Sequence, residues 1–218
     1  MNENNPLQQY FRQPAIYVTL PSQGKFYATD ALIMPPTGEL PVYPMTAIDE
    51  ITYRTPDALF NGQSTVNVLQ SCVPNIKNGW AIPAMDIDAL LIAIRIASYG
   101  HNMEFGTVCP KCNHSAEHTL DLRTALDSIR AGDYTSSLNS GDMEIFFRPM
   151  TYQNLNDNNK LQYTNQKALQ NIPTTDASDD DKITALGAAL KKITEITVSA
   201  LAQSISAVKT PTALVTEP

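Results

Sequence analysis

The amino-acid sequence predicts an α+β protein with a mainly helical body, a small antiparallel sheet and a zinc-ribbon-like Cys-x-x-Cys hairpin. Apolar residues recur at helical spacing over residues 85–99 and again over residues 181–208, which predicts two long helices. Residues 103–122 alternate as two strands around a pair of cysteines, which is the pattern of a hairpin. Together these patterns predict helices packed beside a small sheet.

The composition indicates a folded protein that binds other proteins. Hydrophobic residues make up 43% of the 218 residues, whereas charged residues make up 17%, below the quarter or so of an ordinary domain. The net charge is −7 and no cluster of Lys and Arg occurs, which argues against a nucleic-acid partner. No apolar run is long enough to span a membrane, and the N-terminus lacks the features of a signal peptide. We therefore expect no membrane contact and synthesis in a cytoplasm.

The chain divides into three predicted parts. Residues 1–19 are mostly polar with a few apolar anchors, which predicts an extended N-terminal arm that packs on the body or reaches a partner. Residues 20–172 form the predicted α+β core, with the hairpin at 103–122. Residues 173–218 form a predicted linker and C-terminal amphipathic helix, which packs on its own domain or on another subunit.

A strand-to-helix phrase occurs twice in the sequence. The segments from Glu39 to Thr46 and from Glu144 to Thr151 each read Glu, apolar strand, Pro-Met-Thr and then helix. Threonine is a good N-cap, so each phrase predicts a helix that begins after Pro-Met-Thr. Pro41 confines the first strand to a sheet edge. The two strands either pair in one sheet or resemble each other by coincidence.

The remaining elements follow from periodicity and capping residues. Residues 85–99 form the most apolar helix, which we expect in the core, with Gly100 as its C-cap. Arg95 on this helix needs a carboxylate or several carbonyls if buried, or else lies at the rim. The other predicted elements are a turn at 20–27, helices at 46–55, 56–60, 64–73 (capped by Ser64), 121–129 and 151–169, a loop at 75–83, a strand at 143–148 and a connector at 172–181.

The clearest chemical feature is the Cys-Pro-Lys-Cys sequence at the tip of the predicted hairpin. Cys109 and Cys112 are separated by two residues, a spacing at which two thiolates reach one Zn²⁺ ion across a tight turn. Pro110 favours that turn, and Asn113 follows where a left-handed residue is needed. A closed structural site needs four ligands, so this pair supplies half of one.

The other two ligands are less clear from the sequence. Cys72 is the remaining thiol and the candidate third ligand, although it is equally well explained as a small core residue. His101, His114 and His118 are candidates for the fourth ligand, and His114 is nearest in the sequence to the knuckle, the turn formed by residues 109–112. The predicted structural Zn²⁺ site is therefore Cys109, Cys112, Cys72 and His114. A thioredoxin-like redox motif is disfavoured, because such a pair lies at a helix N-terminus rather than between strands.

The sequence contains little that predicts catalysis. The nine glycines are scattered, so no phosphate-binding loop is formed, and no serine or cysteine has the context of a nucleophile elbow. We therefore expect no enzymatic activity. A zinc- or thiol-dependent enzyme stays open as the alternative from a different class.

A family resemblance rests on an ordered series over about residues 20–125. Its members are Leu20-Pro21-Ser22-Gln23-Gly24-Lys25-Phe26-Tyr27, Pro44-Met45-Thr46, Ser71-Cys72-Val73, the segment from Asp88 through Leu90-Leu91-Ile92-Ala93-Ile94-Arg95-Ile96-Ala97-Ser98-Tyr99 to Gly100, the Cys109–Cys112 knuckle and Asp121-Leu122. In these residues the chain resembles the T-even-like phage baseplate protein family, whose best-known member is described as a baseplate hub component.

The resemblance implies a structural component of the tail baseplate, in the hub or inner baseplate, of a contractile-tailed bacteriophage. It implies contacts with other baseplate and tail proteins, multiple copies in a symmetric assembly, and no enzymatic activity. The expected location is the virion tail, with the host cytoplasm during assembly. Shared structural positions are implied at Cys72, Arg95, Cys109 and Cys112. We expect contacts through the N-terminal arm, the 20–27 loop and the C-terminal helix; a transient assembly chaperone stays open as an alternative.

Overall fold

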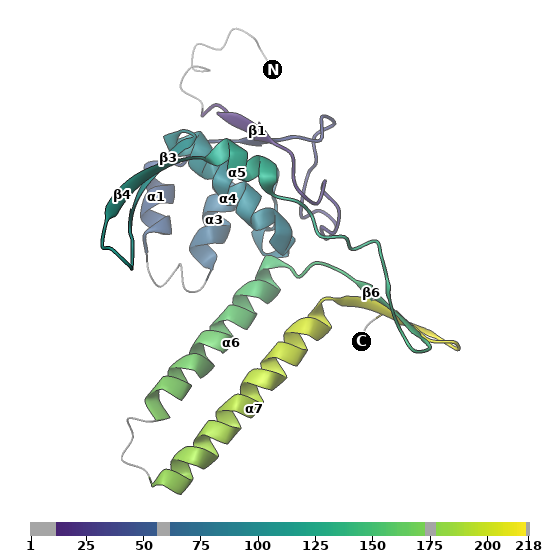
Figure 1. Cartoon of the computed structure of the whole chain (residues 1–218). Helices are drawn as coiled ribbons and strands as arrows, with labels where there is room; N and C mark the ends of the chain where they lie inside the picture. The colour runs from purple at the N-terminus through teal and green to yellow at the C-terminus, as the bar shows by residue number, and fades with distance from the viewer. Residues whose placement is uncertain (1–11, 56–61, 173–177, 217–218) are drawn as a thin grey trace.

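The computed structural model describes residues 12–55, 62–172 and 178–216 (Figure 1). In chain order its elements are β1 (Ile16–Val18), β2 (Leu40–Val42), α1 (Ala47–Tyr53), α3 (Gln63–Cys72), the 3₁₀ helix η2 (Gly79–Ala81), α4 (Ala84–Tyr99), β3 (Asn102–Val108), β4 (Ser115–Asp121), α5 (Leu122–Ser128), β5 (Leu138–Ser140), β6 (Met143–Phe147), α6 (Tyr152–Asn171), α7 (Asp179–Gln203), β7 (Ile205–Lys209) and β8 (Leu214–Val215).

The molecule consists of a helical body and a long helical hairpin that projects from it. In Figure 1, α1, α3, α4 and α5 lie together with the β1 and β3–β4 segments, while α6 and α7 extend side by side away from them. All sheets of the described residues are antiparallel: β1–β2, β3–β4 and the four-stranded sheet β5–β6–β7–β8. The predicted α+β class is therefore confirmed. Among the described residues, no helix is long and apolar enough to cross a membrane.

The N-terminal strands close one side of the core. Val18 on β1 and Leu40 on β2 are opposite each other in the ladder, and both are buried. Pro41 lies in β2, whose only ladder partner among the described residues is β1, so the edge position predicted from this proline is confirmed. Residues 12–19 of the predicted arm thus lie against the body, and residues 1–11 are outside the described residues.

Helix α4 is the centre of the core. Leu90, Ala93 and Ile94 are buried in a cluster with side chains from the β1–β2 pair and from α3. Gly100 ends the helix with φ +84°, and its N–H donates to the carbonyl of Ile96, as the C-cap prediction expected. The core cluster contains Val18, Leu20, Leu40, Val42, Val68, Leu69, Cys72, Val73, Ile76, Ile82, Ile87, Leu90, Ala93 and Ile94.

Arg95 lies at the rim of this core. Its guanidinium donates to the carbonyl oxygen of Gly100 at 3.3 Å and lies over the ring of Tyr99, 4.7 Å from the ring centroid. The interpretation of Arg95 as a rim residue is therefore confirmed.

Both Pro-Met-Thr phrases cap helices as predicted. Thr46 and Asp49 form a reciprocal capping box at α1, and Thr151 forms the same box with Asn154 at α6. The strands before the phrases do not share a sheet, because β2 pairs with β1 whereas β6 pairs with β5 and β7. The proposed pairing of the two strands in one sheet is therefore wrong.

The two phrases instead hold the two ends of α4. The N–H of Met45 donates to the Ser98 hydroxyl at 2.9 Å near the C-terminal end of this helix. At the other end, the N–H of Ala84 donates to the carbonyl of Met150 at 2.8 Å. Tyr152, at the start of α6, also stacks on Trp80 with ring centroids 5.5 Å apart. This stack attaches the projecting pair of helices, α6 and α7, to the body.

The predicted cap of helix α3 is wrong. Helix α3 is capped by Gly62 rather than Ser64, because Gly62 adopts φ +74° and the helix begins at the next residue. The side-chain oxygen of Ser64 is buried without a hydrogen-bond partner. The helix predicted over 56–60 lies outside the described residues.

The C-terminal helix is shorter than predicted. It ends at Gln203, whereas the apolar pattern predicted helix to residue 208. Ile205 and Val208 instead lie in β7, where Val208 is opposite Ile145 of β6. Both residues are β-branched and continue the helical spacing, so the local pattern fits a helix and a strand equally well.

Candidate metal centre and contact surfaces

The hairpin tip has the backbone geometry expected of a cysteine knuckle. The N–H of Cys109 donates to the carbonyl of His114 at 2.9 Å, and the N–H of Asn113 donates to the carbonyl of Cys109 at 2.8 Å. Asn113 adopts φ +54°, the left-handed conformation predicted for it. The seven-residue strands β3 and β4 pair in continuous register from Asn102–Asp121 to the tip. The predicted hairpin is therefore confirmed.

The turn places its two thiols together and favours the thiolate form of one of them. Hydrogen bonds from the backbone of Lys111 and of Cys112, and from the Cys112 side chain, lower the pKa of the Cys109 thiol. Cys109 is half-buried and Cys112 is exposed. A pair with these properties can bind a soft or borderline metal ion through sulfur.

Cys72 lies elsewhere, in the core at the end of α3. It is fully buried, and Nη2 of Arg12 donates to its sulfur at 3.2 Å. Burial raises the pKa of this thiol to about 11, which keeps it neutral at physiological pH. Cys72 thus packs as a small core residue, in line with the alternative interpretation of this cysteine.

The histidines are also separated. The Nε2 atom of His118 lies 3.1 Å from the Thr107 hydroxyl, and its ring packs against Phe105. The carbonyl of His101 accepts from Leu122 at the base of the hairpin. Within the part of the chain that the structure describes, no group of three or more His, Cys, Asp or Glu side chains is placed to hold a metal.

The predicted four-ligand set is therefore not assembled in one chain. Cys109 and Cys112 are adjacent, His114 lies exposed at the same tip, and Cys72 is in the core. The structural Zn²⁺ ion stays a prediction, with the tip cysteines as the two residues whose placement fits it.

A cluster of polar contacts around Arg12 was not predicted from the sequence. Its Nε atom donates to the carbonyl of Pro44 at 2.7 Å, and Nη1 donates to the carbonyl of Ser71 at 2.9 Å. Its Nη2 atom lies 3.5 Å from a carboxylate oxygen of Asp49. Burial raises the pKa of Asp49, but hydrogen bonds from Thr46 and Ser71 and the charge of Arg12 outweigh it, so the net pKa is lowered.

The turn at 20–27 is held by a second buried carboxylate. Asp86, in the first turn of α4, accepts from the N–H of Ser22 at 2.8 Å, from its hydroxyl at 2.5 Å and from the Tyr27 hydroxyl at 3.0 Å. Burial raises the pKa of Asp86 by more than these hydrogen bonds lower it. The Ser22 and Tyr27 side chains therefore hold the turn against the first turn of α4.

Comparison with known proteins identifies the family. The model of the family described as T4 bacteriophage base plate protein matches residues 35–210. This chain belongs to that family. No curated protein and no solved structure matches the chain. The match extends from just before β2 through β7 and includes the β3–β4 hairpin and the helices α6 and α7. The family resemblance is therefore confirmed and extends to residue 210, while the Leu20–Tyr27 segment lies before the matched residues.

Membership of the baseplate family fixes the coarse biological setting. The protein is a phage baseplate protein of the virion tail, and its partners are other phage tail proteins. Its contacts in a baseplate must come from the surfaces that the fold leaves free.

The helical arm of this baseplate protein, formed by α6 and α7, carries a row of exposed apolar residues on α7. On α7, Ile183, Leu190 and Leu201 are 68%, 52% and 63% exposed, and Leu186 and Val198 are exposed beside them. Ile196 is buried on the side that α7 turns to its neighbours. An exposed row of this kind is typical of a surface that binds another protein.

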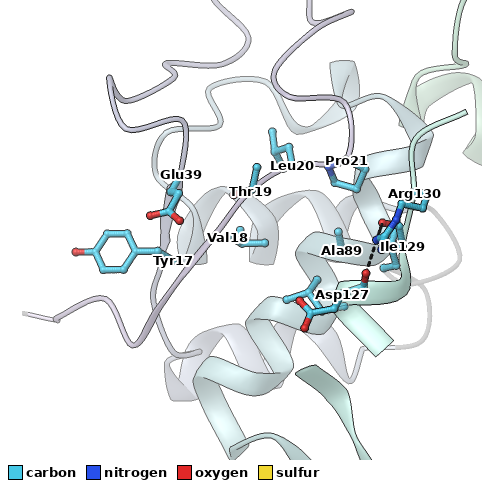
Figure 2. A pocket seen from close by; sticks show the side chains of 11 residues that line it. Tyr17, Val18, Thr19, Leu20, Pro21, Glu39, Ala89, Asp127, Ile129 and Arg130 are labelled. Atoms are coloured by element: carbon cyan, nitrogen blue, oxygen red, sulfur yellow. Dashed lines mark hydrogen bonds between the residues drawn. The ribbon is translucent and has the colours of Figure 1, made fainter. Parts of the chain in front are cut away.

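A surface pocket of about 370 Å³ lies between β1 and the end of α5 in the baseplate protein (Figure 2). Tyr17 and Glu39 line one side, and Asp127, Ile129 and Arg130 line the other. The guanidinium of Arg130 donates to the carbonyl oxygens of Asp127 and Ile129, so it is engaged by its own segment. The lining lacks a nucleophile paired with a base, so it is not arranged for covalent catalysis.

Proposed function

We propose that this protein is a structural component of the hub or inner baseplate of a contractile-tailed phage, and that it acts through protein–protein contacts without enzymatic activity. The observation that carries the proposal is the arm formed by α6 and α7, which projects from the body and exposes apolar side chains along its length. Multiple copies in a symmetric assembly fit this role, since each copy presents the same arm.

The exposed row on α7 has the spacing of a helix-binding surface. Ile183, Leu186 and Leu190 follow one another at intervals of three and four residues, which places them on one side of the helix. Full burial of a side chain of this size contributes about 2 kcal/mol, so a partner that covers three of them gains substantial binding energy. Lys191 and Glu195 are 3.9 Å apart on the exposed surface of the same helix and supply a polar border.

Assembly of tail particles tests this proposal. Replacing Leu190 with Asp places a charge in the middle of the row, and we expect loss of the chain from affinity-purified tail complexes. Ser199→Asp is the matched control, because residue 199 is exposed and nine positions along an α-helix correspond to the opposite side. Equal incorporation of both variants would show that the row on α7 does not bind tail proteins.

Quantification of the chain in finished particles tests the structural role itself. A structural component is present in purified virions in a fixed ratio to other baseplate proteins. If the chain is found in assembly intermediates but is absent from finished particles, it is a transient assembly chaperone and the structural proposal is wrong.

A further inference from the structure

The tip of the β3–β4 hairpin carries metal-binding groups that the fold itself does not use. Cys109 and Cys112 lie together there, and Val108 beside them is 65% exposed. All seven residues of β3 are exposed, and the hairpin stands out at one side of the body (Figure 1). Both thiols are therefore accessible to a second molecule.

No further ligand of the same chain joins this pair. Cys72 lies in the core, His118 contacts Thr107, and His101 is at the opposite end of the hairpin from the tip. The described residues include all cysteines and histidines of the chain, and no group of three metal-ligating side chains forms among them. A structural zinc site is four-coordinate, so two more ligands have to come from outside.

We propose that one Zn²⁺ ion binds between the hairpin tips of two copies of this chain, held by Cys109 and Cys112 of each copy. Each thiol loses its proton on coordination, so four protons are released and the four-sulfur centre carries a net charge of roughly −2. Lys111 lies between the two cysteines and is exposed, so the two lysines of the pair offset this charge.

A second copy is the partner that the tip itself favours. The same surface supplies the missing thiolates, the compensating lysine and an exposed Val108 that packs at the border of the contact. The backbone turn is already formed, with the two thiols adjacent, so little reorganisation is needed for coordination.

The first test compares the full chain in reducing buffer with added zinc and with EDTA. We expect one zinc per two chains by metal analysis, and a mass by light scattering that doubles with zinc and reverts with EDTA. Cobalt in place of zinc should give the intense visible absorption of a tetrahedral thiolate site. No bound zinc, one zinc per chain, or a mass that is the same with zinc and EDTA would overturn the proposal.

Variants at the tip separate its ligands. Cys109→Ser and Cys112→Ser should each abolish both zinc binding and the zinc-dependent doubling of mass, with an unchanged far-UV circular dichroism spectrum. His114→Asn is the matched control at the same tip and should retain both properties. If His114→Asn loses zinc, or if the serine variants still pair with zinc, the four-cysteine site is wrong. Should a serine variant fail to fold, the zinc and EDTA comparison on the unaltered chain decides.

Discussion

At the scale of single residues, two carboxylates hold the N-terminal segment against the helices. Asp86 receives three hydrogen bonds from Ser22 and Tyr27, and Asp49 receives hydrogen bonds from Thr46 and Ser71 and the charge of Arg12. Because Asp86, Ser22 and Asp49 are buried, a buried donor such as the Ser22 N–H that loses its acceptor by mutation has little water to replace it.

Asp86→Ala should therefore destabilise the protein strongly. The change leaves the backbone N–H of Ser22 and two hydroxyls without their acceptor, and we expect a loss of about 3 kcal/mol in the free energy of unfolding. Urea denaturation followed by circular dichroism measures this loss. Asp88→Ala is the control on the same helix, because Asp88 is exposed, and it should change stability little. Equal effects of the two variants would contradict a role for the buried carboxylate.

The pH dependence of stability should carry the signature of Asp49. Its folded-state pKa lies below the ordinary value of 3.8, so its contribution is present above that value and is lost as the pH falls through the folded-state pKa. Asp49→Asn removes this titration, so its stability should vary less with pH than that of the unaltered chain below about pH 4. Thermal melts across that range measure the difference, and parallel curves for the two proteins would contradict the assignment.

These networks could not be predicted from the sequence, whereas the knuckle could. Ser22 and Asp86 are 64 positions apart, and Arg12 and Asp49 are 37 apart, so no local pattern connects them. The turn at Cys109 is set by neighbours within a few residues, and its geometry was predictable for that reason. No local pattern connects Cys72 with the hairpin tip, and the structure places Cys72 in the core at the end of α3.

At the scale of elements, three helix caps were predictable, whereas the Gly62 cap of α3 and the end of α7 were not. Thr46, Thr151 and Gly100 act within one turn of their own helices, so their residue types were sufficient. The end of α7 depends on pairing of β7 with β6, which lies more than fifty residues earlier in the chain. Tertiary pairing overrode the helical period there.

Two glycines, one at the end of a helix and one inside a helix, should affect stability in opposite directions when they are replaced by alanine. Gly100 has φ +84°, so Gly100→Ala should cost about 1 kcal/mol from backbone strain although no atom lies within 4 Å of the added carbon. Gly187 lies inside α7 with equally open surroundings, and Gly187→Ala should stabilise the helix by about 0.5–1 kcal/mol. Chemical denaturation measures both, and changes of the same sign would contradict the assignment.

At the scale of the whole molecule, the packing of Tyr152 on Trp80 joins the arm to the body. Tyr152→Ala should shift the fluorescence of Trp80, the only tryptophan of the chain, towards that of a solvated indole, because the stacked ring is lost. Tyr163→Ala, three turns further along α6, should leave the emission unchanged. Identical spectra for Tyr152→Ala and the unaltered chain would show that the stack does not form.

The two Pro-Met-Thr segments bind opposite ends of α4 through hydrogen bonds, and this arrangement has a mechanical consequence. Tension on α6 reaches the body through contacts that include the Tyr152–Trp80 stack and two backbone hydrogen bonds, from Ala84 to Met150 and from Tyr152 to Ile82. Because Ala84 is the first residue of α4, we expect part of this tension to be carried along that helix. In optical-trap pulling with one handle at the C-terminal end of α6 and the other on β1, we expect the contacts of α6 with residues 82–84 and with Trp80 to rupture before α4 unfolds. Unfolding of α4 first would contradict that order. Until these contacts rupture, we expect α4 to move as one rigid helix. A displacement of α6 and α7 would then reach the Met45–Ser98 contact at the other end of α4.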